Sequence, residues 1–168
     1  MPARAFATER QMFIGGTLGY SYIDEHYQWF SGLGATGEFR YGLNDAIDLE
    51  VDASAYGYPT GHQLVPATSA GLIYVLDTMH IIPQVGATIG VNDIWTVTCS
   101  QKGDRPCGHE AHPSLSIPAA IDLRVTSHLS LGAHFRYTFL VPLHRKSGWG
   151  PLLSQITIGA AIEFSTPQ

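Results

Sequence analysis

The densest group of chemically active side chains lies in the stretch CGHEAHP, which begins at Cys107. It contains His109, Glu110 and His112 besides the cysteine, and thiolate, imidazole and carboxylate groups are all ligands of zinc. The spacing differs from the helical HExxH motif, because the second histidine follows the first by three residues and a proline comes next. We therefore interpret the stretch as a polar exposed loop and predict neither a metal site nor a cofactor.

Cys99 and Cys107 are the only two cysteines of the chain, and both lie in its longest predicted loop. An even number of cysteines close together in an exported protein is typical of a disulfide. We predict a Cys99–Cys107 disulfide that closes a small surface loop. A metal-binding or reactive-thiol role for the pair is the alternative.

His128, Ser130 and His134 supply the residue types of a serine hydrolase, for example a lipid deacylase. Such chemistry also needs an oxyanion donor and an acid that orients the base. Neither group can be named from the sequence, and the stretch TSHLS is typical of a tight turn. We therefore predict that the protein is not an enzyme.

Apolar residues alternate with Asp48, Glu50, Asp52 and Ser54 in the stretch AIDLEVDASAYGY, which begins at Ala46. The acidic members are Asp48, Glu50 and Asp52. A period of two residues indicates a β-strand with two chemically different faces. The question is which of these faces points into the protein.

Eight stretches of the chain alternate in this way, and none shows a helical period. They cover residues 11–22, 31–41, 46–58, 64–76, 81–91, 115–125, 129–141 and 153–164. Strands of globular proteins have about five to six residues, whereas a strand that crosses a membrane needs about nine to eleven. The lengths therefore favour membrane-spanning strands.

The connections between these strands alternate between short and long. Short connections are expected at residues 42–45, 77–80 and 126–128, and longer ones at 23–30, 57–63, 92–114 and 142–152. An up-and-down barrel with short periplasmic turns and long extracellular loops has this pattern. The sequence thus predicts an all-β, eight-stranded antiparallel up-and-down transmembrane β-barrel.

The composition also favours a membrane barrel. Charged residues make up 14% of the chain, against about 25% in typical soluble domains. Lysine occurs only as Lys102 and Lys146, although soluble sheets usually carry lysine on their edges and outer faces. The net charge of −5 argues against nucleic acid as a partner, and no apolar run is long enough for a transmembrane helix.

The polar face of the strands carries acids and arginines among glycine, serine and threonine. It holds Glu38, Arg40, Asp48, Glu50, Asp52, Asp122, Arg124, His134, Arg136 and Glu163. If this face points inward, the charges pair in one interior network, and the aliphatic face contacts lipid. We expect this arrangement. The alternative is a soluble calycin-like barrel that encloses an apolar ligand.

The stretches AIDLEVDASAYGY, IDLRVTSHLSLGAHFRYTF and ITIGAAIEF resemble the small eight-stranded outer-membrane barrels of the OmpA/OmpX type. The resemblance implies a bacterial outer-membrane localisation, with residues 1–10 as a periplasmic segment, 11–164 as the barrel and 165–168 as a tail. If the protein is exported, the printed chain lacks its leader. Phe164 is similar to the strand-end aromatic read by the barrel assembly machinery, so this machinery and outer-membrane lipids are the implied partners.

Aromatic side chains gather in two of the predicted long loops, as Tyr27, Trp29, Phe30 and Trp149. They are candidates for binding a partner, or they form part of an interfacial aromatic belt, which we favour. The predicted role is structural or interactive: a barrel that displays four extracellular loops, with docking of another envelope component as a candidate role. A lipid-modifying enzyme and a narrow channel are further alternatives.

Overall fold

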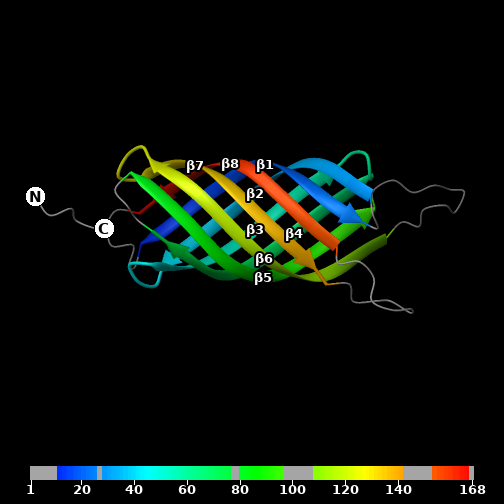
Figure 1. Cartoon of the computed structure of the whole chain (residues 1–168), viewed down its shortest axis with the longest axis horizontal. Helices are drawn as coiled ribbons and strands as arrows, with labels where there is room; N and C mark the ends of the chain where they lie inside the picture. The colour runs from blue at the N-terminus through cyan, green and yellow to red at the C-terminus, as the bar shows by residue number, and fades with distance from the viewer. Residues whose placement is uncertain (1–10, 26–27, 77–79, 97–107, 142–152, 167–168) are drawn as a thin grey trace, which may run out of the picture.

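The computed structural model describes residues 11–25, 28–76, 80–96, 108–141 and 153–166, and shows a closed barrel of eight antiparallel strands (Figure 1). The strands are β1 (Met12–Glu25), β2 (Gln28–Gly42), β3 (Ile47–Tyr58), β4 (Gln63–Val75), β5 (Ile81–Thr96), β6 (Gly108–Arg124), β7 (Leu129–Leu140) and β8 (Leu153–Ser165). Each strand pairs with the next, and β8 closes the barrel against β1. The predicted fold class is confirmed. The described residues contain no helix that is long and apolar enough to span a membrane.

The apolar face of the strands points outward. On β3 the acidic side chains of Asp48, Glu50 and Asp52 are buried, whereas Leu49 and Val51 between them are exposed. The same inversion holds for the barrel as a whole, since most of its buried side chains are polar or charged and its exposed ones include many large hydrophobics. A soluble calycin-like barrel needs the opposite arrangement, so that alternative is wrong.

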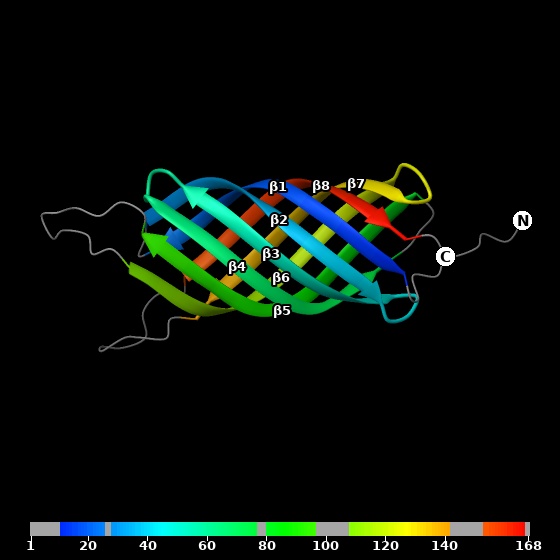
Figure 2. The same ribbon diagram turned by 180° about the vertical axis from the view of Figure 1, so that it is seen from behind.

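The two ends of the barrel differ. The β2–β3 and β6–β7 turns lie at one end, and the β3–β4 turn lies at the other (Figures 1 and 2). We call the first end the short-turn rim and the second the long-loop rim. At the short-turn rim Asn44 Oδ1 accepts hydrogen bonds from the backbone N–H groups of Ala46 and Ile47, both 2.9 Å long. The first and last strands also meet here, where Thr166 N donates to Met12 O.

The strands extend further toward the long-loop rim than the alternation predicts. Residues 23–30 were expected to be a loop, but β1 and β2 pair there down to Glu25 and Gln28. Most of the loop expected at 92–114 is also strand, with Thr96 opposite Gly108. The turn expected at 57–63 shortens to residues 59–62, because β3 and β4 pair up to Tyr58 and Gln63. Backbone pairing continues after the two-faced side-chain pattern ends, since a wall outside the bilayer needs no apolar outer face.

Two glycines on β2 make room for two tyrosines on β3 inside the narrow barrel. A Cβ atom on Gly34 would lie 2.6 Å from the Tyr56 ring, and one on Gly32 would lie 2.8 Å from the Tyr58 ring. These distances are shorter than van der Waals contact, so only glycine fits at either position. The two tyrosine rings therefore pack against the β2 backbone at Gly32 and Gly34 and fill the interior near the long-loop rim.

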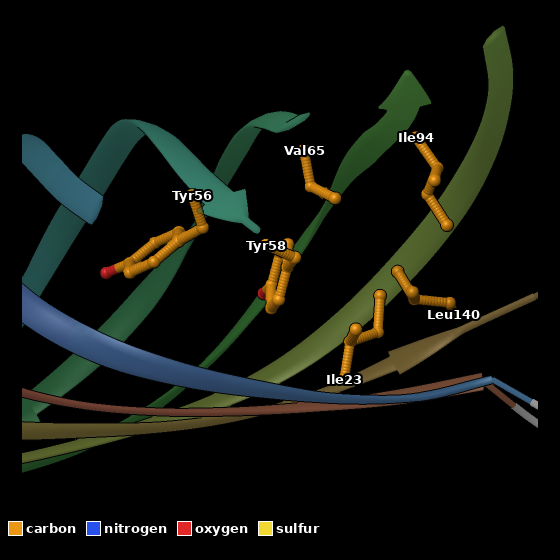
Figure 3. Close-up of a cluster of buried hydrophobic side chains, with 6 residues drawn as sticks. All are labelled: Ile23, Tyr56, Tyr58, Val65, Ile94 and Leu140. Carbon is orange, nitrogen blue, oxygen red and sulfur yellow. The ribbon is translucent and has the colours of Figure 1, made fainter. Parts of the chain in front are cut away.

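Apolar side chains close the interior near both rims. Near the long-loop rim we define the upper cluster as Ile23, Tyr56, Tyr58, Val65, Ile94 and Leu140 (Figure 3). Phe30 packs against this cluster. Near the short-turn rim a smaller cluster consists of Ile73, Val75 and Ile82. The inward-facing Ile73 and Val75 explain why both faces of residues 64–76 are partly apolar in the sequence. The interior is thus polar in its middle and apolar toward each end.

Candidate functional site

The candidate site is the polar interior of the barrel, where arginines connect strands that are not neighbours. Arg136 on β7 donates from Nη1 to Asp52 Oδ1 at 2.7 Å and from Nη2 to Glu50 Oε1 at 2.9 Å. Both carboxylates belong to β3, which lies four strands away around the closed barrel. Ser69 Oγ on β4 also donates to Asp52. This fork-like pairing is charge-assisted and ties opposite walls together.

A second cluster surrounds Arg40 on β2, which is almost fully buried. Its guanidinium group pairs with Glu163 on β8, donates a 2.5 Å hydrogen bond to Gln84 Oε1 on β5, and lies 3.8 Å from Asp48. Gln84 in turn donates from Nε2 to Asp122 Oδ2 on β6 at 2.5 Å. One buried cation therefore connects several strands near the short-turn rim.

His134 on β7 lies between two carboxylates and a hydroxyl group. Its Nε2 is 3.1 Å from Asp122 Oδ1, and its Nδ1 is 3.3 Å from Thr17 Oγ1 and 3.7 Å from Glu38 Oε2. The order of acid, imidazole and hydroxyl resembles a catalytic triad, but Thr17 is buried inside the barrel. A lipid-modifying enzyme would need its nucleophile on the membrane-facing wall, so this arrangement does not support one.

The remaining predicted residues also have defined places. Arg124 lies at the short-turn end of β6, and Ser130 lies opposite it on β7, while His128 belongs to the turn between the two strands. Ser130 is also opposite Glu163 in the β7–β8 register. Within the described residues, the predicted charged face of the strands thus lines the interior. The contacts given above join most of it into the two arginine clusters and the contacts around His134.

Neutral polar residues form a further network that the sequence reasoning did not single out. Tyr58 donates from its hydroxyl to Ser21 Oγ at 2.7 Å, and Gln155 Nε2 donates to the same two side chains at 2.9 and 3.0 Å. Asn92 Nδ2 donates to Gln155 Oε1 at 3.0 Å. Ser21 and Asn92 each lie two positions before a member of the upper cluster, so this network borders the cluster and shares Tyr58 with it. The sequence does contain a signal for this network, namely the amide side chain of Gln155 on the polar face of the alternating stretch 153–164.

The histidines of the CGHEAHP stretch do not converge. This part of the chain is strand β6 from Gly108 onward, so His109 and His112 point to opposite faces. The His109 side chain is 72% exposed and contacts Asp93 at 3.1 Å, whereas that of His112 is 7% exposed. The described residues contain no group of three ligating side chains suited to a metal ion. The prediction of a loop here was wrong from Gly108 onward, and Cys99 and Cys107 lie outside the described residues.

Two of the four candidate interaction residues can be placed. Trp29 on β2 is 59% exposed at the long-loop rim, while Phe30 packs against the upper cluster. Tyr27 and Trp149 lie outside the described residues. Phe30 therefore helps to close the interior, whereas Trp29 is an aromatic side chain presented outward at this hairpin.

The outer wall has the chemistry of a lipid-facing surface. Leu18 is 73% exposed in the middle of β1, and similar aliphatic side chains surround the barrel. Toward the long-loop rim, Tyr20 packs edge-to-face against Tyr22, with ring centroids 4.9 Å apart, and Tyr137 packs similarly against Phe139. An apolar band with aromatic residues near its borders is typical of outer-membrane barrels.

Comparison with solved structures identifies the same fold. Neisserial surface protein A superposes with a TM-score of 0.73 at 15% identity, covering 91% of this chain and 96% of that one. The N-terminal β-barrel domain of Pseudomonas aeruginosa OprF gives 0.63 at 17% identity, with coverages of 94% and 98%. Ail, the attachment invasion locus protein of Yersinia pestis, gives 0.59 at 13% identity, with coverages of 94% and 99%.

No family model and no curated protein sequence matches the chain. The likeness is therefore one of fold: the chain is a small eight-stranded β-barrel of the outer-membrane type, as the sequence resemblance implied. This fold and the apolar outer wall together support the predicted outer-membrane localisation.

Proposed function

We propose that the protein is a closed outer-membrane anchor, not an enzyme or an open channel, whose long-loop rim interacts with another component of the cell envelope. The observation that carries this proposal is the upper cluster, which fills the barrel directly beneath the rim. Eight-stranded barrels have an interior that side chains can just fill. A filled interior leaves the two rims and the outer wall as the surfaces on which the protein acts.

The cross-barrel contacts support the closed state. A diffusing solute would have to pass the upper cluster, the amide–hydroxyl network around Gln155, and the side chains of Arg136 and Arg40. Each of these layers consists of buried or partly buried side chains held by strands from different parts of the wall. Opening a path requires breaking several buried contacts together, which is costly.

The asymmetry of the rims supports interaction at the long-loop end. The β1–β2 and β5–β6 pairs continue toward this rim beyond the alternating stretches, and Trp29 is exposed on the first of them. Exposed tryptophan is enriched among residues that dominate binding energy at interfaces. Outer-membrane lipids contact the wall, and the barrel assembly machinery is the partner proposed for folding.

Site-specific photo-crosslinking in the native outer membrane tests the interaction. A crosslinking amino acid at Trp29 is expected to yield a discrete adduct with a protein of the envelope. The matched control places it at Tyr74, an exposed aromatic on β4 near the short-turn rim. Adducts with lipid alone at both positions would contradict the proposed interaction and leave a purely structural role.

A further inference from the structure

Carboxylates outnumber cationic groups inside the barrel. Among the described lumen residues there are six carboxylates, namely Glu38, Asp48, Glu50, Asp52, Asp122 and Glu163, against the three arginines Arg40, Arg124 and Arg136 and two imidazoles, His112 and His134. Even with both imidazoles protonated, six negative charges face five positive ones. An uncompensated charge in such an enclosure is costly, so the interior needs protons or additional cations.

A cavity lies beside the excess carboxylate. It has a volume of about 50 Å³, and its lining includes Glu38, Glu50, Asp52 and the hydroxyl groups of Ser54 and Ser69. A buried water needs roughly 10–15 Å³ measured in this way. The cavity thus has room for a partly hydrated ion.

Glu38 is the carboxylate in this cavity that the arginines do not satisfy. Arg136 hydrogen-bonds Glu50 and Asp52, whereas Glu38 Oε1 has no hydrogen-bond partner and its side chain is only 5% exposed. The other oxygen, Oε2, is 3.7 Å from His134 Nδ1. Glu38 lies directly opposite Asp52 in the β2–β3 register, so two inward carboxylates are adjacent at this level.

We propose that the lumen binds a small singly charged metal cation of the sodium class in this cavity, against Glu38. Carboxylate, hydroxyl and water oxygens are the ligands that hard cations prefer. A divalent ion bound without water would need several converging carboxylates, and no group of three such side chains forms a metal cluster in the described part of the barrel. This inference goes beyond the proposed anchor function and does not depend on it.

The test compares unfolding of the whole protein in sodium chloride and in N-methyl-D-glucamine chloride at equal ionic strength. The organic cation is too large for the cavity. In nonionic detergent, the heat-dependent gel shift reports the folded fraction. We expect a folded-to-unfolded ratio about tenfold higher in sodium, as saturation of a weak site gives by mass action. Equal stability in both salts would overturn the proposal, since protons would then balance the charge.

Variants assign the ion to its site. Glu38→Gln should lose the sodium dependence, whereas Asp45→Asn, which removes an exposed carboxylate in the β2–β3 turn, should keep it. If Glu38→Gln does not fold, Ser54→Ala removes one lining hydroxyl and should reduce the sodium effect. Sodium dependence that is unchanged in the lumen variant examined, or lost in Asp45→Asn, would overturn the assignment to this cavity.

Discussion

Arg136 Nη1 donates a 2.7 Å hydrogen bond to Asp52 Oδ1, although the two residues lie on opposite walls of the barrel. The contact spans the whole interior and joins the seventh strand to the third. Backbone pairing joins only neighbouring strands, whereas side chains that fill the narrow interior can join strands on opposite walls. The Arg136–Asp52 contact therefore holds the two walls together directly.

Replacing Arg136 with Met should strongly destabilise the barrel. Glu50 and Asp52 would lose their cation while staying buried, and removing one partner of a buried ion pair costs about 3–5 kcal/mol. Urea titration in detergent, followed by tryptophan fluorescence, measures the free energy of unfolding. His128→Ala in the exposed β6–β7 turn serves as the control. A loss below about 1 kcal/mol would contradict the structural role of the pair.

Tyr58→Phe should weaken the network that borders the upper cluster. The variant keeps the ring and removes only the hydroxyl group that contacts Ser21 and Gln155. Ser21 and Gln155 keep the hydrogen bond between them, so the expected cost is that of the lost tyrosine hydrogen bonds, about 0.5–1.5 kcal/mol each. The same titration measures this loss, and an unchanged unfolding midpoint would show that the network contributes no net stability.

The fold class and the orientation of the faces could be predicted from the sequence because both depend on local patterning. The alternation around Asp48, Glu50 and Asp52 places them on one face whatever the rest of the chain does. The partners of these residues could not be predicted in the same way. Pairing of Asp52 with Arg136 depends on how the strands are staggered around the closed barrel, and no short stretch of sequence specifies that stagger.

The upper cluster was missed for a related reason. Ile23 and Ile94 lie in stretches that were assigned to loops, because the apolar–polar alternation ends before the strands do. Tyr56 and Tyr58 belong to a predicted strand, but their packing needs the bare wall at Gly32 and Gly34. Side chains that meet at strand ends come from distant parts of the chain, so a reading along the sequence does not bring them together.

Substitution by alanine should destabilise the barrel at one glycine of β2 and leave its stability unchanged at another. In Gly34→Ala the new methyl group would clash with the backbone of Ala55 and with the Tyr56 ring, whereas nothing lies within 4 Å of a Cβ on Gly37. We expect Gly34→Ala to cost about 1–3 kcal/mol or to block folding, and Gly37→Ala to stay within about 0.5 kcal/mol of the wild type. Refolding yield and unfolding midpoint measure both variants. Equal effects would contradict an arrangement in which Gly34 faces the interior and Gly37 faces outward.

A charge on the outer wall should be costly in lipid. Leu18→Arg places a guanidinium group in the middle of β1, where about 2–4 kcal/mol is expected for a site near the bilayer centre. Leu43→Arg adds the same charge at the short-turn rim and should be nearly neutral. Refolding equilibria in phospholipid vesicles measure both variants. A neutral Leu18→Arg would place this part of the wall outside the hydrocarbon.

Single-channel recording in planar lipid bilayers tests most directly whether the barrel is a closed anchor. The folded wild-type protein should insert without producing conductance steps, since the upper cluster and the clusters around Arg40 and Arg136 fill its interior. Reconstitution is verified independently by the heat-dependent gel shift of the same preparation. Reproducible conductance steps from the wild-type barrel would contradict the closed interior and restore the channel as its function.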